Sequence, residues 1–203
     1  MALTRVLAAV GQFPQDDAVL ARALEIVAKH GARLSIVHVV DLRAPEPDLG
    51  DYDTLQGQAA FAARDRIEAA LTSLQADPAG VDIHIEAGSP ALRLIEICDD
   101  HRPDLIVMRA HQKYRIVDRI IGSTTDRMIA AGQVPVLVVK RRVGKPYARV
   151  VLATDGRDDA SSALSFVAGL LPGARLHLVQ AVHVAPQLEE AMLRAGTDQS
   201  ALA

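Results

Sequence analysis

The sequence is poor in several residue types that mark common classes of protein. It holds a single cysteine, Cys98, which excludes an internal disulfide and a zinc site built from cysteines. Aromatic residues make up only 3% of the 203 residues and tryptophan is absent, so a folded core must be aliphatic. The longest apolar runs, such as 105–108 and 134–139, fall far short of the roughly 20 residues that cross a bilayer. We therefore expect no membrane insertion.

The charges are balanced, with no large excess of one sign. The 22 Lys and Arg residues against 25 Asp and Glu give a net charge of -3, which argues against a nucleic-acid binder that works through bulk positive charge. Half of the residues are hydrophobic and 23% are charged, as in an ordinary folded protein. The sequence starts at Met1 and runs straight into an apolar segment without a charged leader, so we expect a cytoplasmic protein.

Five short runs rich in Val, Ile and Leu fall within the first 140 residues. Most are continuous rather than alternating, which is typical of strands buried on both faces of a parallel sheet. The third run alternates, as expected for an edge strand with one wet face. The runs are 5–10, 33–40, 81–86, 104–108 and 134–140.

Helical patterns separate these runs. Residues 16–30 place Val19, Leu20, Ala23, Leu24 and Val27 on one face, and Gly31 follows as a stop signal. Further helices are predicted at 54–75, with Phe61, Ile67, Leu71 and Leu74 as apolar anchors, at 90–101 and at 123–131. This alternation predicts an α/β fold: a doubly wound, five-stranded parallel sheet over residues 1–140.

After a basic linker at 141–148, the sequence repeats its opening. The run 149–155 echoes 5–11, and the run that starts at Gly173 echoes the run that starts at Gly31, with a helical pattern between the paired runs. We interpret 149–203 as a partial second copy with two strands and two helices. It has no counterpart of the last three runs of the first copy.

The stretch 104–126, followed by 134–139, carries the most chemistry. In it a buried strand leads into a loop, and Gly122, Ser123 and Thr124 then open a helix. Glycine and hydroxyl residues at a helix N-terminus suit an anion, because free backbone N–H groups and the helix dipole face the ligand. The same residues also suit a simple helix cap, and the residues alone leave both interpretations open.

The order and spacing of these motifs resemble the universal stress protein (UspA) family. That family's signature is a strand similar to Asp-Leu-Ile-Val-Met-Gly, then Gly-x2-Gly-x9-Gly-Ser/Thr, then Pro-Val-Leu-Val-Val. Here Arg109 stands at the first glycine, Gln112 at the second, and Gly122 at the third. The resemblance covers 3–140 as a whole domain and 149 to about 195 as a partial one, similar to the tandem, UspE-like members. It implies an adenine-nucleotide alpha-hydrolase-like sheet in the order 3-2-1-4-5.

Departures from the family pattern bear on nucleotide binding. The resemblance implies an acid at the end of the first strand, near adenine and ribose, where this sequence has Gly11; the partial copy keeps one, Asp155. Arg109 and Gln112 put side chains where glycines would let phosphates touch the backbone. Arg109 could compensate by pairing with a phosphate. We therefore expect a degenerate nucleotide site, with no firm cofactor and with ATP or AMP as the nucleotides to test.

Ligands of doubly wound sheets bind at the carboxyl ends of the strands. His111 follows the fourth strand and either lines that crevice or is part of the loop structure. No metal-binding histidine spacing, P-loop, Rossmann fingerprint or nucleophile elbow is present, so we name no catalytic or metal residue. The candidate ligand-binding residues are Gly11, Val39, Arg109, His111, Gln112, Gly122, Ser123 and Thr124.

Three functions stay open at this point. The first, which we favour, is a non-enzymatic stress-response protein that dimerises and takes at most a small ligand. The second is an ATP- or AMP-binding universal stress protein with weak ATPase or autophosphorylation activity, as the family's glycine-motif members imply. The third is an enzyme of the wider superfamily, whose His-x-Gly-His and Ser-Gly-Gly-x-Asp-Ser motifs are absent here.

The partial copy is the reason to expect a dimer. Two parallel strands and their helices cannot cover both faces of a sheet, so 149–195 would expose apolar surface and free strand edges. Ala163, Phe166, Val167, Leu170 and Leu171 would have too little to pack against. We expect a homodimer in which 149–195 form much of the interface.

Overall fold

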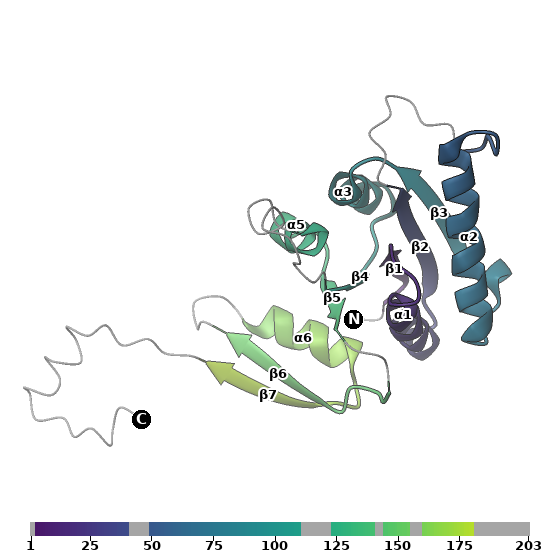
Figure 1. The fold of residues 1–203 in the computed structure, drawn as a ribbon. Coiled ribbons are helices and arrows are strands. Elements are labelled where there is room, and N and C mark those ends of the chain that lie inside the picture. Colours follow the sequence, from purple (N-terminus) through teal and green to yellow (C-terminus); the bar gives the residue numbers. More distant parts are fainter. Residues whose placement is uncertain (1–2, 41–48, 111–122, 141–143, 155–159, 181–203) are drawn as a thin grey trace, which may run out of the picture. The chain divides into compact units, whose positions relative to one another are not determined.

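The computed structural model describes residues 3–40, 49–110, 123–140, 144–154 and 160–180 (Figure 1). The chain divides into two compact units, Ala2–Pro146 and the part from Tyr147 onward. The helices of the described residues fall short of the length and apolar character needed to cross a membrane.

Five parallel strands form the sheet of the first unit, in the order β3-β2-β1-β4-β5 (Figure 1). Every neighbouring pair is parallel, so the predicted fold class and strand order are confirmed. The alternating run predicted for an edge, β3, lies at one edge. The strands are β1 (Arg5–Val10), β2 (Arg33–Val40), β3 (Asp82–Ala87), β4 (Leu105–Arg109) and β5 (Val136–Val139).

Two pairs of helices cover the two faces of this sheet. Helix α1 contacts α2, and α3 contacts α5 (Figure 1). Helix α1 ends where the stop signal predicted, at Gly31 with a φ of 64°, a backbone conformation that glycine adopts without strain. The helices are α1 (Asp17–His30), α2 (Leu55–Ser73), α3 (Pro90–His101) and α5 (Thr124–Ala131), with a short 3-10 helix, η1 (Pro78–Gly80).

The aliphatic core under α3 and α5 forms the base of the candidate site. Leu7 and Val37 of the strands, each 1% exposed, pack there with Leu94 and Cys98 of α3 and Met128 of α5. Burial raises the pKa of the Cys98 thiol to about 11, with a smaller contribution from nearby Asp99. The thiol therefore stays protonated at neutral pH, as suits a core residue.

One predicted anchor of α2 is wrong. Phe61 is 40% exposed, and its ring contacts that of Tyr52 in a tilted arrangement, with 5.3 Å between centroids and 55° between the ring planes. The predicted anchors Ile67 and Leu71 are buried, and small residues such as Ala60, next to Phe61, complete a stripe that lets the helix approach the sheet closely. That stripe is Gly57, Ala60, Ala63, Ile67, Ala70 and Leu71.

A single carboxylate ties the starts of β1 and β4 together. Asp104 Oδ2 accepts hydrogen bonds from the Thr4 backbone N–H (2.7 Å), the Thr4 hydroxyl (2.8 Å) and the Arg5 backbone N–H (2.9 Å). Partial burial opposes ionisation of Asp104, but these hydrogen bonds outweigh it and lower its pKa below the ordinary range.

The second unit has the predicted strand–helix–strand order. Strands β6 (Arg149–Thr154) and β7 (Arg175–Gln180) are parallel, and α6 (Ala160–Leu170) lies between them in sequence. The Arg175 backbone N–H donates to the Ala148 carbonyl at 2.9 Å, just as that of Arg33 donates to Thr4 at 2.8 Å in the first unit. The second predicted helix lies outside the described residues, and the tandem type stays a prediction.

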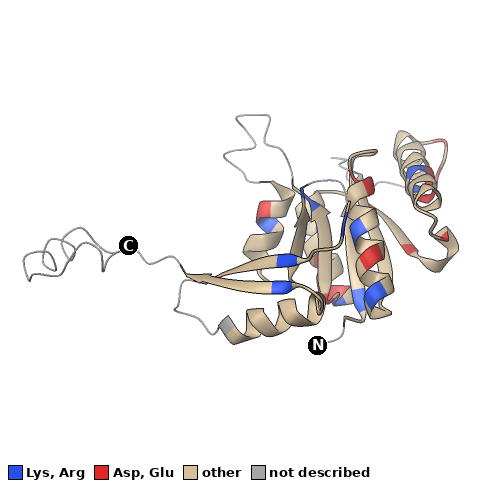
Figure 2. Ribbon diagram, turned by 90° about the horizontal axis from the view of Figure 1, so that it is seen from below, with Lys and Arg blue, Asp and Glu red and all other residues tan. Residues whose placement is uncertain are grey.

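The second unit exposes apolar side chains. Val151, Leu178 and Val179 are 64%, 60% and 49% exposed, and Leu164 of α6 is exposed as well. Figure 2 shows few charged residues on this unit: β6 and β7 each begin with one arginine, and α6 carries no charged residue. Among the described residues β6 pairs with β7 alone.

The helix of the second unit is packed better than the sequence suggested. We expected too few contacts along its whole apolar face, and Ala163 is indeed exposed. Phe166, Val167 and Leu171 are half-buried, however, and Leu170 is buried, so the prediction is wrong for Leu170. The carboxyl end of α6 is therefore better buried than its beginning.

Candidate functional site

A cavity of about 440 Å³ opens at the carboxyl ends of β1, β2 and β4, beside the first turns of α3 and α5. This is the crevice expected for a doubly wound sheet, and its volume lies in the range of small-molecule sites, roughly 300–1,000 Å³. Four predicted residues line it: Gly11, Val39, Arg109 and Thr124. Three others, His111, Gln112 and Gly122, lie outside the described residues.

One part of the lining is apolar. This part belongs to the core between the sheet and helices α3 and α5, and it consists of Val37, Val39, Leu94 and Met108. Pro90 and Ala91, at the start of α3, extend this surface. A flat ring or an aliphatic body would find complementary contacts here, whereas a charged group would lose its hydration without a partner.

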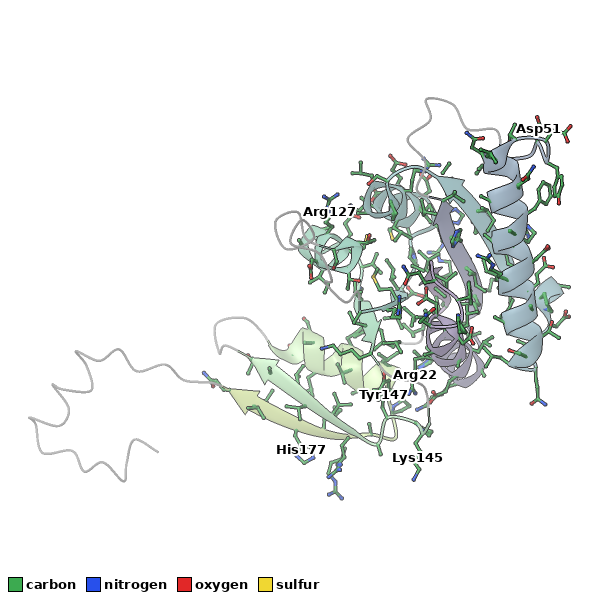
Figure 3. All side chains as sticks on the ribbon, in the orientation of Figure 1. Arg22, Asp51, Arg127, Lys145, Tyr147 and His177 are labelled. Atoms are coloured by element: carbon green, nitrogen blue, oxygen red, sulfur yellow. The ribbon has the colours of Figure 1, made fainter. Side chains whose placement is uncertain are left out.

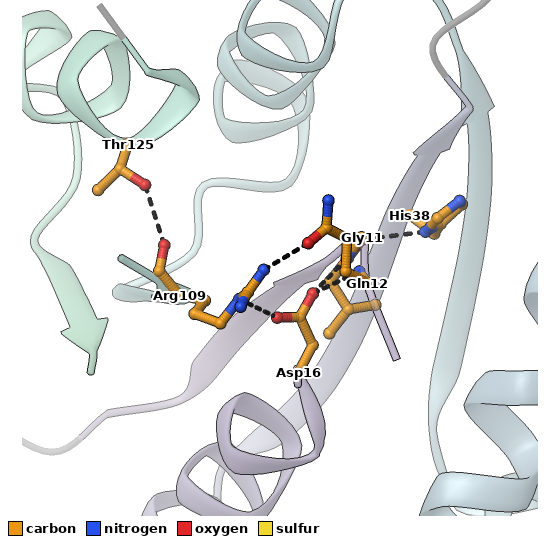
Figure 4. Close-up of polar contacts among 7 residues, drawn as sticks. Gly11, Gln12, Asp16, His38, Arg109 and Thr125 are labelled. Atoms are coloured by element: carbon orange, nitrogen blue, oxygen red, sulfur yellow. Dashed lines mark hydrogen bonds and ion pairs between the residues drawn. The ribbon is translucent and has the colours of Figure 1, made fainter. Parts of the chain in front are cut away.

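The polar part of the lining centres on Asp16, which the sequence analysis did not single out (Figure 4). Its Oδ2 atom accepts hydrogen bonds from the backbone N–H groups of Gly11 (2.6 Å) and Gln12 (2.7 Å). The Asp16 side chain is only 5% exposed. A buried carboxylate thus lies at the end of β1, although no acid stands at position 11.

Arg109, at the end of β4, is held against this carboxylate (Figure 4). Its Nε atom lies 2.7 Å from Asp16 Oδ1, in an ion pair that is not an aligned hydrogen bond. Its Nη2 group donates to Gln12 Oε1 at 2.7 Å, and its carbonyl accepts from the Thr125 hydroxyl at 3.1 Å. The arginine that replaces the first signature glycine is therefore already paired within the protein.

Ser123 serves as the N-cap of α5. Its hydroxyl oxygen accepts from the Asp126 backbone N–H at 3.2 Å, and the Asp126 carboxylate accepts from the Ser123 backbone N–H at 2.9 Å. The sequence left open whether these residues form an anion site or a helix cap. The reciprocal capping box is the helix cap. Thr124 and the exposed Arg127, which Figure 3 labels on α5, line the cavity next to it.

His38 contacts the end of β1 beside the cluster (Figure 4). Burial lowers its pKa, so the ring is neutral at pH 7, and Nδ1 lies 3.0 Å from the Val10 carbonyl, to which it donates as the protonated nitrogen. The contact fixes the last residue of β1 just before the Gly11 and Gln12 N–H groups.

Sequence reasoning missed Gln12 and Asp16, the two side chains that pair with the Arg109 guanidinium, and it did not name Ser89, Thr125 or Arg127 of the lining. The signal for Asp16 was present, since an acidic pair precedes the periodic pattern of α1 and marks a helix start. Nothing in the sequence shows that its side chain turns back toward β1. No group of three or more metal-binding side chains occurs in the part of the chain that the structure describes.

The sequence matches one family of known proteins. The model of the universal stress protein family matches residues 3–140. Two universal stress proteins of Methanocaldococcus jannaschii are 36% identical over 58 residues and 39% identical over 64 residues. These matches cover 29% and 30% of this chain, and the chain spans only 36% and 38% of the length of those two relatives.

Solved structures share the fold. A universal stress protein in complex with cAMP has a TM-score of 0.55 at 19% identity, covering 68% of this chain and 98% of its own. Universal stress protein UspA from Lactobacillus plantarum has a TM-score of 0.54 at 22% identity, covering 69% and 99%. The Archaeoglobus fulgidus protein in complex with dAMP has a TM-score of 0.51 at 17% identity, covering 69% and 100%. Since the family model spans more than half of the sequence, the chain belongs to the universal stress protein family.

Proposed function

We propose that this chain is a non-enzymatic universal stress protein that dimerises through its second unit and carries a degenerate nucleotide site. The observation that carries the proposal for the site is the ion pair between Asp16 and Arg109 in the lining of the cavity. A cytoplasmic location, expected from the sequence, belongs to the same proposal.

The charges of the lining disfavour a polyphosphate. Arg109 is neutralised by Asp16, which leaves the exposed Arg127 as the other cation among the described lining residues. A phosphate chain that approached Arg109 would also approach the Asp16 carboxylate, and like charges repel strongly where little water separates them.

The described part of the lining also lacks the groups of an obvious catalyst. Ser89 and Thr124 supply hydroxyls, but the described lining residues include no histidine or lysine that could activate them. The one acid among them, Asp16, is held by two backbone N–H groups and an arginine. This supports a role in binding rather than in hydrolysis.

The second candidate function is binding of an adenine nucleotide, with weak ATPase or autophosphorylation activity. The observation that favours it is the cavity itself, whose volume and apolar side suit a nucleoside. Two proteins with the same fold were solved in complex with cAMP and with dAMP. A monophosphate would meet less repulsion at Asp16 than a triphosphate.

Calorimetric titration with ATP and magnesium separates the two candidates. We expect no binding at micromolar concentrations, because Arg109 is paired and Asp16 adds a fixed negative charge. A micromolar dissociation constant, equivalent to about -8 kcal/mol, would contradict the degenerate site. In that case Arg109→Ala should abolish binding, since Arg109 would be the anchor of the phosphates.

The exposed apolar residues of the second unit support dimerisation. Val151 of β6 and Val179 of β7 lie on the same side of a two-stranded sheet in which Val151 pairs with His177 and Ala153 with Val179. Exposed apolar side chains and unprotected strand edges of this kind mark association surfaces. A second copy would bury them across a two-fold axis, the commonest symmetry of protein dimers.

Light scattering on the full chain tests this part of the proposal. We expect about twice the chain mass of 21.7 kDa, and the monomer mass after Val151→Asp combined with Val179→Asp. Leu92→Asp is the matched control, because Leu92 is 58% exposed but lies on α3 of the first unit. A well-behaved wild-type monomer at micromolar concentration, or dissociation caused equally by Leu92→Asp, would contradict the proposed interface.

A further inference from the structure

Asp16 stands at the N-cap of α1 but does not cap that helix. A capping side chain accepts a hydrogen bond from the first turn of its own helix, and Asp16 makes no such bond. Its carboxylate turns back instead and accepts from the N–H groups of Gly11 and Gln12, the two residues that follow β1. The usual structural reason for an acid at this position therefore does not explain where its side chain goes.

The groups around the carboxylate form an anion site. Two successive backbone N–H groups, at 2.6 and 2.7 Å from Oδ2, converge with the guanidinium of Arg109, at 2.7 Å from Oδ1. Such a set of donors binds carboxylates and phosphates in proteins, and the arginine adds strength and direction. The set lies in the lining of the cavity, and the side chain that fills it is 95% buried.

We infer that Asp16 determines the specificity of the cavity by filling its anion site from within. The protein's own carboxylate takes the place that a ligand phosphate would need at Arg109, so the cavity accepts compact ligands without a polyphosphate, such as a nucleoside. This inference rests on the proposed degenerate nucleotide site and adds a cause for it. Removal of the carboxylate leaves a cavity that binds phosphates.

Two substitutions remove the charge while keeping the local fold. Asp16→Asn keeps a carbonyl oxygen for the two backbone N–H groups but turns its amide nitrogen toward Arg109, which releases the guanidinium. Asp16→Ser keeps a favoured N-cap residue and removes the carboxylate altogether. Asp17→Asn is the matched control, since Asp17 is the neighbouring acid, half-buried in the first turn of α1.

The test titrates each full-length variant with magnesium ATP and, separately, with adenosine. We expect both Asp16 variants to bind ATP about tenfold or more tightly than the wild type, which corresponds to one paired charge released to the ligand. Adenosine, which has no phosphate, should change by less than about twofold. Asp17→Asn should match the wild type with both ligands.

Each outcome has a separate meaning. If both Asp16 variants give the circular dichroism of the wild type and neither gains ATP affinity, the role of Asp16 is wrong and the degenerate site stands. Equal gains for ATP and adenosine would also overturn it, because they would indicate a wider cavity rather than a released anion site. Micromolar ATP binding by the wild type would overturn both the inference and the proposed function.

Discussion

The two units contain the same strand–helix–strand arrangement, but matching side chains are buried in the first unit and exposed in the second. Strands β1 and β2 pair as β6 and β7 do, and each pair opens with an equivalent hydrogen bond. Yet Leu7 is 1% exposed and Val151, at the matching position, is 64% exposed. Val37 and its match Val179 differ in the same way, at 1% and 49%.

The difference in exposure shows that β1 and β2 are buried by elements that follow them in the chain. In the first unit α3 and α5 cover the side of the sheet that holds Leu7 and Val37, and β4 pairs with the free edge of β1. The second unit has no counterpart of these elements among its described residues. A run of Val and Leu thus predicts a strand, but not the cover that would bury it.

Introducing a charge at the matched positions should break the first unit and spare the second. We expect Leu7→Asp to lower the free energy of unfolding by about 4–5 kcal/mol or more, because it buries an unpaired carboxylate. Val151→Asp should leave the thermal unfolding of the first unit unchanged, since that side chain is exposed. Circular dichroism during urea and thermal unfolding of the full chain gives both values.

The control for this comparison is Leu7→Ala, which removes volume without adding charge and should cost about 2–5 kcal/mol. If Val151→Asp destabilised the first unit as much as Leu7→Asp does, the fold of that unit would depend on Val151 as much as on its own Leu7. The contrast between the two units would then be false in solution.

The fold was largely predictable because its signals are local. Apolar runs separated by helical patterns indicated the five strands, and the family resemblance supplied their order. The limits of single elements were less certain: the run 134–140 yields a strand only over Val136–Val139. Pro135 has no N–H to donate, although its carbonyl still accepts a hydrogen bond from the Ile106 N–H of β4.

The candidate site was predictable only in part. Val39 and Arg109 follow directly from the rule that strand ends form the crevice, and both line the cavity. Asp16 and Gln12 could not be found in this way, because a tight turn brings them together. In that turn the Asp16 backbone N–H donates to the Gln12 carbonyl at 2.9 Å, which returns the carboxylate to the end of β1.

The smallest expected effect concerns the link between β1 and β4, which has no counterpart among the described residues of the second unit. Thr4 supplies a hydroxyl to Asp104, whereas its match in the second unit is Ala148. We expect Asp104→Asn to lower the free energy of unfolding at pH 7 by less than about 1 kcal/mol, because the site is near the surface and solvent screens it.

The pH dependence of that loss provides the sharper test. Asp104 has a lower pKa in the folded chain than in the unfolded one, so its contribution is complete above the unfolded value of about 3.9 and disappears as the pH falls through the folded value. The difference in the free energy of unfolding between wild type and Asp104→Asn should therefore be constant from pH 7 to about pH 5 and shrink below about pH 4.

Urea unfolding at a series of pH values measures this difference, with Asp100→Asn, which changes an exposed acid on α3, as the control. A difference that grew on acidification would mean that the hydrogen bonds of Asp104 favour its protonated form, and that β1 and β4 are joined in another way.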